Sequence, residues 1–215
     1  LLLSGVLQVW VLAVLLHFVG QRATPGGFGD PIEMKLTAVE KAAALVKSGA
    51  TLEVLLVGEG SDPAMHEFPA VYGSLLRSVP HRFVNGNRNA LRPIGPTTVL
   101  LQDGEFSAQR TYGGWSAKTE AIPMRSGGGD FTLLYLPQRS EDISTRAPFP
   151  TYRHLANGVT LMGYTPLPGD TLHWEIYWET GKAVAADYHF FNHLLDDNGV
   201  RVGQADAPTF SASQW

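Results

Sequence analysis

Three polar side chains with ligand-binding chemistry, His173, Glu175 and Tyr177, alternate along one predicted strand near the C-terminal end of the sequence. Successive side chains of a strand point to opposite faces, so these three share one face. The alternate positions, which include Trp174 and Trp178, form an apolar stripe that we expect to be core. An aromatic ring on the polar face can stack on a sugar. The pattern therefore predicts a carbohydrate site at Tyr177, with His173 and Glu175 beside it.

A second motif is the segment GEGSDP at 58–63, which follows a predicted strand and precedes a predicted helix. Phosphate-binding loops are built this way, because free amides at a helix N-terminus favour anions. The dinucleotide pattern needs a third glycine, however, and the Walker pattern needs Gly-Lys followed by Ser or Thr. Glu59 and Asp62 would also repel a phosphate. We therefore interpret the segment as an ordinary turn with a helix cap and expect no cofactor.

The histidines give little support for a metal site. His189 and His193 are four residues apart in a predicted strand, which separates them by about 13 Å, too far to hold one ion. A cross-strand pair of His173 with one of them stays open as an alternative. His66 has only Glu67 as a neighbour and is expected to be a surface residue. We therefore assign no metal ligand.

No residue pattern predicts catalysis. The sequence has no cysteine, which removes thiol nucleophiles, redox pairs and disulfides. It also lacks a G-x-S-x-G elbow and a pair of acidic residues spaced as acid and base on one face. With a net charge of −4 and no run of basic residues, the chain does not look like a nucleic-acid-binding protein. Its composition, 44% hydrophobic and 17% charged, is that of a folded globular protein.

The N-terminal run at 1–20 is uncharged and apolar apart from Ser4, Gln8 and His17. As a helix it would reach about 30 Å, the thickness of the hydrocarbon core of a bilayer. We therefore predict one N-terminal transmembrane helix, which would make the lipid bilayer a partner. A secretory signal segment and a buried helix are the alternatives. The first is disfavoured because the first charge, Arg22, follows the run.

Two domains are expected after this run. The first, at 24–137, has a helix at 31–48 that Asp30 would cap and Gly49 would end, and a strand at 52–57. A second helix would begin at Asp62-Pro63 or, because Pro69 disfavours the first turn, only at Pro69. Strands at 81–84, 98–101 and 131–136 complete the pattern of a small α/β sandwich with a partly parallel sheet.

The second domain is expected at 151–215, after a polar linker at 138–150 that ends in proline. Short strands at 159–164, 171–178, 188–195 and 200–205, with a tight Asn-Gly hairpin at 196–199, predict a β-sandwich. We expect this sandwich to be incomplete, with its last strands missing from this sequence. The predicted fold class is therefore α/β plus all-β.

Nearly the whole chain resembles the C-terminal extramembrane part of bacterial membrane proteins related to family 39 glycosyltransferases, the dolichyl-phosphate-mannose-protein mannosyltransferase type. The segments that carry the resemblance are TPGGFGDPIEMKLTAVEKAAAL, LEVLLVGEGSDPAMHEFPAVYGSLL, HRFVNG, NGVTLMGYTPLPGDTLHWEIYW and DYHFFNHLLDDNGVRVGQADAPTF. In such enzymes the catalytic acidic residues lie near the first membrane helices, so no catalytic residue is carried over to this chain.

The resemblance implies a non-catalytic, extracytoplasmic tail of a glycosyltransferase that uses a lipid-phosphate-linked sugar. Such a tail would position an acceptor glycan or protein. Two other hypotheses stay open. One is a membrane-anchored carbohydrate-binding module without enzymatic activity, and the other is a structural, interaction-mediating domain.

Overall fold

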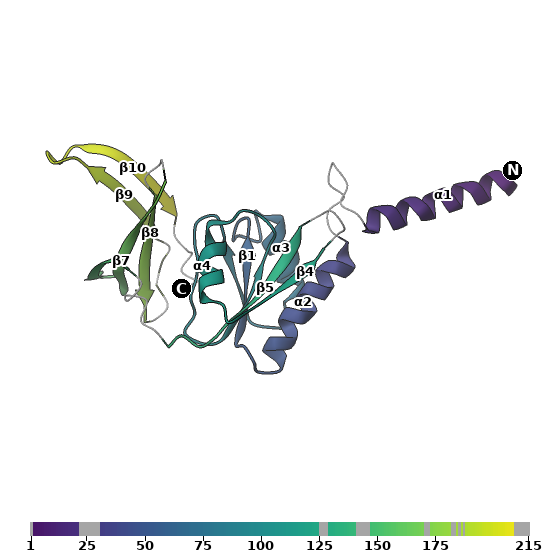
Figure 1. The fold of residues 1–215 in the computed structure, drawn as a ribbon, viewed down its shortest axis with the longest axis horizontal. Helices are drawn as coiled ribbons and strands as arrows, with labels where there is room; N and C mark the ends of the chain where they lie inside the picture. Colours follow the sequence, from purple (N-terminus) through teal and green to yellow (C-terminus); the bar gives the residue numbers. More distant parts are fainter. Residues whose placement is uncertain are drawn as a thin grey trace. The chain divides into compact units, whose positions relative to one another are not determined.

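The computed structural model describes residues 2–21, 31–124, 129–140, 147–169, 173–181, 184, 186 and 188–208. It shows a mixed α/β protein with several sheets, and four helices lie in this described part. The chain divides into two compact units, residues 1–138 and residues 139–215 (Figure 1). The boundary between them falls at the start of the predicted linker.

A helix, α1 (Leu2–Gln21), is present where the membrane span is predicted. The side chains described along it are exposed, among them Leu3, Trp10 and Leu16. Across the described ranges, however, no helix has the length and apolar character needed to cross a membrane. The predicted transmembrane helix at 1–20 is therefore not supported.

The first unit is built on a five-stranded sheet with the order β2-β1-β3-β5-β4. Its strands are β1 (Glu53–Gly58), β2 (His81–Asn85), β3 (Thr97–Leu101), β4 (Lys118–Pro123) and β5 (Asp130–Leu136). β1 pairs in parallel with β2 and β3, whereas β5 runs antiparallel to both β3 and β4. The expected partly parallel sheet is therefore confirmed.

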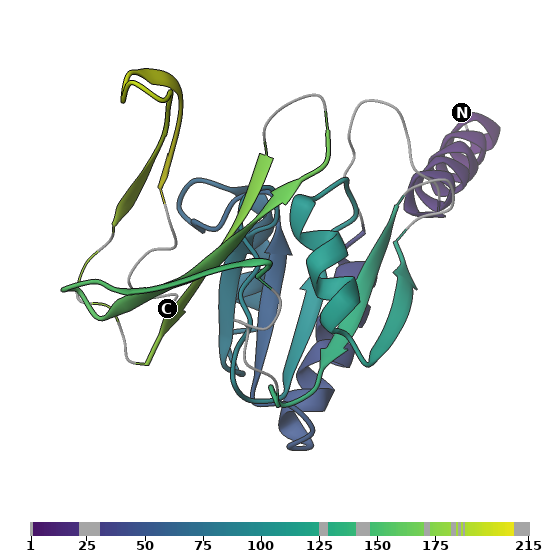
Figure 2. The same ribbon diagram turned by 60° about the vertical axis from the view of Figure 1, so that its left-hand side comes forward.

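The central strands β1 and β3 are buried on both faces, as their nearly continuous apolar runs predict. On one face, side chains of α2 (Ile32–Lys47) and α3 (Glu67–Leu75) share a core with Val54, Leu56 and Leu100. Figures 1 and 2 show α4 (Ser107–Trp115) on the opposite face from α2. The helices that follow β1 and β3 therefore lie on opposite faces of the sheet.

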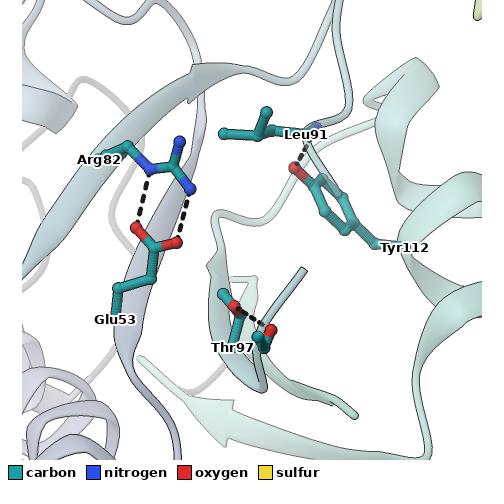
Figure 3. A network of polar contacts seen from close by, with 6 residues as sticks. Glu53, Arg82, Leu91, Thr97 and Tyr112 are labelled. Atoms are coloured by element: carbon teal, nitrogen blue, oxygen red, sulfur yellow. Dashed lines mark hydrogen bonds and ion pairs between the residues drawn. The ribbon is translucent and has the colours of Figure 1, made fainter. Parts of the chain in front are cut away.

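A network of polar contacts lies beside the strands of this sheet (Figure 3). The carboxylate of Glu53 accepts two hydrogen bonds from the guanidinium of Arg82 across the β1–β2 pair. On the α4 side, the fully buried Tyr112 accepts a hydrogen bond of 2.9 Å from the backbone N–H of Leu91. Burial raises the pKa of Tyr112 above its ordinary value, and the Leu91 bond offsets only part of this shift.

The expected first helix is confirmed as α2, and Gly49 takes a left-handed conformation after it with φ +76°. The proposed cap Asp30 lies outside the described residues. The second helix begins at Glu67, between the two expected starts at Asp62-Pro63 and at Pro69, because Asp62 organises a turn instead. Its Oδ1 accepts the N–H of Ala64 at 2.8 Å, and its carbonyl accepts the N–H of His66 at 2.9 Å. Helix α4 and strand β4 were not predicted.

The second unit contains two antiparallel sheets. One has the order β6-β7-β8 and consists of β6 (Phe149–His154), β7 (Val159–Leu167) and β8 (His173–Thr180). The other is the hairpin of β9 (His189–Leu195) and β10 (Arg201–Pro208). In the turn that joins them only Gly199, and not Asn198, has a positive φ. The four predicted strands are present, and their packing as a β-sandwich stays a prediction.

Candidate functional site

The polar face of β8 brings together two of the three predicted ligand-binding residues. The hydroxyl of Tyr177 donates a hydrogen bond of 2.9 Å to the carboxylate of Glu175, two residues earlier on the same face. Thr165, which lies opposite Glu175 on the neighbouring strand β7, donates a hydrogen bond of 3.3 Å to the Tyr177 hydroxyl. Glu175, Tyr177 and Thr165 therefore form a small hydrogen-bonded ladder across two strands.

His173 lies at the beginning of β8, opposite Leu167, and is exposed. Within the residues that the structure describes, no hydrogen bond or ion pair joins it to Glu175 or Tyr177. The structure thus places all three predicted residues on one face, as alternation predicts, but couples only two of them. His173 could contact a ligand only if the ligand extends along the strand from Glu175.

Further polar contacts continue this face toward the other end of β8. Glu179 accepts a hydrogen bond of 2.6 Å from Arg139, and the paired residue Thr160 contacts the Nδ1 atom of His154 at 2.8 Å. Most of the donors and acceptors on this face therefore already have partners within the second unit. A ligand here would have to compete with these contacts.

The opposite face of the same sheet carries three aromatic residues that lie in a row across its strands: Phe149 on β6, Tyr164 on β7 and Trp174 on β8. The rings of Phe149 and Tyr164 stack with centroids 5.2 Å apart and an interplanar angle of 10°. Trp174 contacts Tyr164 edge-on at 5.4 Å and 69°. We call these three residues the aromatic row.

The prediction that Trp174 is core is wrong, because 44% of its surface is exposed. Phe149 is exposed to 49%. Trp178, on the same face of β8, is partly buried and stacks on Phe190 of β9 with centroids 4.2 Å apart. The difference has a physical reason: Trp178 has a ring from the second sheet to cover it, whereas the ring contact of Trp174 is with Tyr164 of its own sheet. Leu172 lies outside the described residues.

Sequence reasoning missed Phe149 and Tyr164 as members of a candidate site. The signal that could have found them is cross-strand pairing, since Phe149 lies directly opposite Tyr164 and Tyr164 opposite Ile176. That register is interrupted by irregularities between Pro150 and Arg153 and between Leu161 and Gly163. Simple alternation along each strand therefore does not reveal it.

The histidines of the second unit do not form a cluster that could hold a metal. His189 pairs with Pro208 and His193 with Gln204, so each faces a residue without metal-binding chemistry or with only a neutral amide. In the ranges described, no group of three or more His, Cys, Asp or Glu side chains could bind an ion.

The β6-β7-β8 sheet therefore presents an aromatic face with two exposed rings and a hydrogen-bonded polar face. No protein-family model, curated protein or solved structure matches this chain.

Proposed function

We propose that the second unit binds carbohydrate on the aromatic row, and that the chain acts as a non-catalytic module that positions a glycan or a glycosylated acceptor. The observation that carries this proposal is the exposure of Trp174 and Phe149 in ring contact with Tyr164. The proposal makes no use of α1.

Exposed aromatic rings in contact with each other favour a ligand with an apolar face. Large aromatic side chains gain free energy when they leave water, and each buries about 150–250 Å² when fully covered. The face of an aromatic ring is electronegative, so it attracts the weakly positive C–H groups on the face of a sugar ring. A row across three strands offers contacts to more than one sugar unit.

The polar face is the weaker candidate surface. The Tyr177 hydroxyl is engaged by Glu175 and Thr165, and Glu179 is engaged by Arg139. Displacing such hydrogen bonds offsets the gain from new ones, since each is worth only about 0.5–1.5 kcal/mol net. A site at His173, Glu175 and Tyr177 is therefore the alternative, and the same experiment tests it.

The wider role follows from the sequence resemblance to the C-terminal part of glycosyltransferases that use a lipid-phosphate-linked sugar. A carbohydrate-binding tail would hold the acceptor near a catalytic domain, and the chemistry would take place elsewhere. The alternative is a binding module without an enzymatic partner. A purely structural domain is the third candidate, and it predicts no glycan binding at all.

A glycan array with the purified chain tests the proposal. Three variants distinguish binding on the aromatic row from binding on the polar face. Trp174→Ala removes part of the aromatic row, Tyr177→Phe removes the hydroxyl of the polar face, and Phe191→Ala is the matched control. Phe191 is an exposed aromatic residue of β9, 68% accessible, outside both faces of the β6-β7-β8 sheet.

Binding that is lost in Trp174→Ala and kept in the other two variants supports the aromatic row. If glycan binding is lost only in Tyr177→Phe, the site lies on the polar face. If the unaltered chain binds no glycan, the structural role is favoured and carbohydrate binding is refuted.

A further inference from the structure

A cavity of about 360 Å³ lies in the first unit, at the carboxyl ends of β1 and β3. Glu59, directly after β1, and Gln102, directly after β3, both line it. These adjacent parallel strands continue into helices on opposite faces of the sheet, α3 after β1 and α4 after β3. In open α/β sheets this arrangement creates a crevice where ligands commonly bind. The volume is within the range of about 300–1,000 Å³ that is typical of small-molecule sites.

Aromatic residues form one wall of the cavity. Phe68 and Tyr72 from α3 and Phe131 from β5 are nearly fully buried, and their ring centroids are 4.8 to 5.9 Å apart. Because these rings pack against one another within the main core, the wall is rigid. Only 3–7% of each side chain is exposed, so the wall offers a small apolar contact area to one side of a ligand.

His66 lines the cavity, and a backbone contact orients its ring. Its Nδ1 atom lies 3.1 Å from the backbone carbonyl of Asp62. A carbonyl can only accept a hydrogen bond, so Nδ1 carries the proton and the neutral ring keeps its Nε2 lone pair as an acceptor. The left-handed Gly60, with φ +78°, makes this possible, because a Cβ at residue 60 would lie 2.2 Å from the His66 ring.

Gln102 is oriented in a similar way. Its Oε1 accepts the backbone N–H of Glu59 at 3.1 Å. Its Nε2 donor has no hydrogen-bond partner within the described part of the chain. Gly58 leaves room for this side chain, since a Cβ at residue 58 would lie 2.5 Å from Oε1 and 2.7 Å from the ring of Phe68. Two glycines of the GEGSDP segment thus allow two polar side chains to line one cavity.

The remaining polar groups at the cavity are mixed in sign. Lys35, whose side chain is only 15% exposed, lies 3.9 Å from the carboxylate of Glu67, and Glu59 adds a second carboxylate. The carboxylates and the His66 Nε2 atom accept hydrogen bonds, whereas Lys35 and the Gln102 Nε2 atom donate them. The carboxylates disfavour a phosphate, and Lys35 disfavours a cation. A hydroxyl group suits this set, because it both donates and accepts.

We propose that this cavity binds a small, uncharged, hydroxyl-rich molecule with one apolar face. The apolar face would lie on Phe68 and Phe131, and the hydroxyl groups would bond to His66, Gln102 and Lys35. This site is separate from the aromatic row of the second unit, and the proposal does not rest on the proposed function of that row.

NMR titration of the full chain with a panel of uncharged polyols and monosaccharides (glycerol, inositol, glucose and mannose) tests this inference. Inorganic phosphate and ethylamine serve as the charged probes. We expect saturable shifts of the backbone amide signals of Glu59, His66 and Gln102 with at least one uncharged probe. Neither charged probe should produce them.

Two variants keep the local hydrogen bond and remove a proposed ligand contact, although Gln102→Glu also adds a carboxylate near Glu59 and Glu67. Gln102→Glu keeps an oxygen for the Glu59 N–H but removes the Nε2 donor, and His66→Asn keeps an N–H for the Asp62 carbonyl but removes the ring Nε2. Each should raise Kd roughly 3- to 10-fold, the effect of one lost hydrogen bond. His81→Asn is the matched control, because His81 makes the same kind of contact, Nδ1 to the Val79 carbonyl at 2.9 Å, and does not line the cavity.

The inference is overturned if no uncharged probe shifts these signals, if phosphate or ethylamine binds more tightly, or if neither variant changes Kd. Trp174→Ala should leave this titration unchanged, so failure of the cavity site and failure of the aromatic row are distinguishable. Well-dispersed spectra of both cavity variants show that a lost response is not loss of the fold.

Discussion

Replacing Tyr112 by Phe removes one hydroxyl from the interior of the first unit and changes little else. Tyr112 is fully buried, and its oxygen accepts the N–H of Leu91 at 2.9 Å (Figure 3). Leu91 belongs to the segment between β2 and β3, so this bond ties that segment to α4. The ring itself, including its edge contact with Trp115 at 5.7 Å, would remain in Tyr112→Phe.

The expected loss of stability at neutral pH is about 1 kcal/mol. A net hydrogen bond contributes about 0.5–1.5 kcal/mol, and an N–H left buried without a partner costs up to about 3 kcal/mol. Because Leu91 is only half-buried, water can reach part of the freed N–H, which favours the lower range.

The stability difference between the unaltered chain and Tyr112→Phe should also depend on pH, which gives a second test. Burial raises the pKa of Tyr112 in the folded state above its ordinary value of 10.0. Below pH 10 the phenol is neutral in both the folded and the unfolded state, so its stabilising contribution is complete. Above this pH the unfolded state loses the proton first, and the free energy of unfolding falls by about 1.4 kcal/mol per pH unit. By about pH 11 this loss exceeds the roughly 1 kcal/mol advantage, so Tyr112→Phe should become the more stable protein.

Urea unfolding of both proteins between about pH 8 and pH 11.5 measures this difference. Lysines and the other tyrosines are common to both, so their titration cancels in the comparison. Hydrogen exchange of the Leu91 amide adds a local readout, because its protection should fall in the variant at neutral pH. Equal stability at pH 8, or an unchanged order of stability up to about pH 11.5, would refute the role assigned to the buried phenol.

Two further substitutions test the first unit. Gly60→Ala forces a Cβ against the His66 ring at a positive φ. We expect the free energy of unfolding in urea to fall by about 1–3 kcal/mol and the His66 NMR signal to shift. An unchanged stability and an unchanged signal would mean that the turn relaxes freely. Glu53→Gln weakens the partly buried, two-point contact with Arg82 across β1 and β2 and should lower the free energy of unfolding by about 1–3 kcal/mol. The control Glu40→Gln, at an exposed residue, should change it by less than about 0.5 kcal/mol. Equal effects of the two substitutions would contradict the stabilising role of the Glu53–Arg82 contact.

The elements with strong local patterns could be predicted from the sequence. The apolar runs of β1 and β3 and the helical spacing of α2 are such patterns, because burial on both faces or on one stripe leaves a clear periodicity. Helix α4 is only nine residues long, so its apolar pattern is short. Its sequence SAQRTYGGW contains two adjacent glycines, which weaken helix propensity, and its place depends on the tertiary burial of Ala108 and Tyr112.

Strand β4 was missed for a related reason. It is an edge strand with the sequence KTEAIP, in which only Ile122 is buried. Charged residues on an edge strand protect the sheet from pairing with other chains, but they also remove the apolar alternation that identifies a strand. Its partner Lys41 of α2, which contacts Glu120, is 79 residues away in the sequence and gives no local signal.

In the candidate site, too, the local features could be predicted from the sequence and those that depend on the fold could not. Alternation along β8 correctly placed His173, Glu175 and Tyr177 on one face, because that property is local to one strand. The exposure of Trp174 is not local. It depends on which rings from the other sheet cover the apolar face: Trp178 stacks on Phe190 of β9, whereas the ring contact of Trp174 is with Tyr164 of its own sheet. The cavity beside His66 likewise depends on two loops, the helices α2 and α3, and the strand β5, which meet only in the fold.

Carbohydrate binding by the aromatic row is the central claim, and calorimetric titration of the best glycan from the array into the full chain and its Trp174→Ala variant tests it most directly. Removing an aromatic anchor from a binding surface typically costs more than about 1 kcal/mol, so Kd should rise about fivefold or more in Trp174→Ala. It should stay unchanged in Phe191→Ala. Equal Kd values for Trp174→Ala and the unaltered chain would contradict the account.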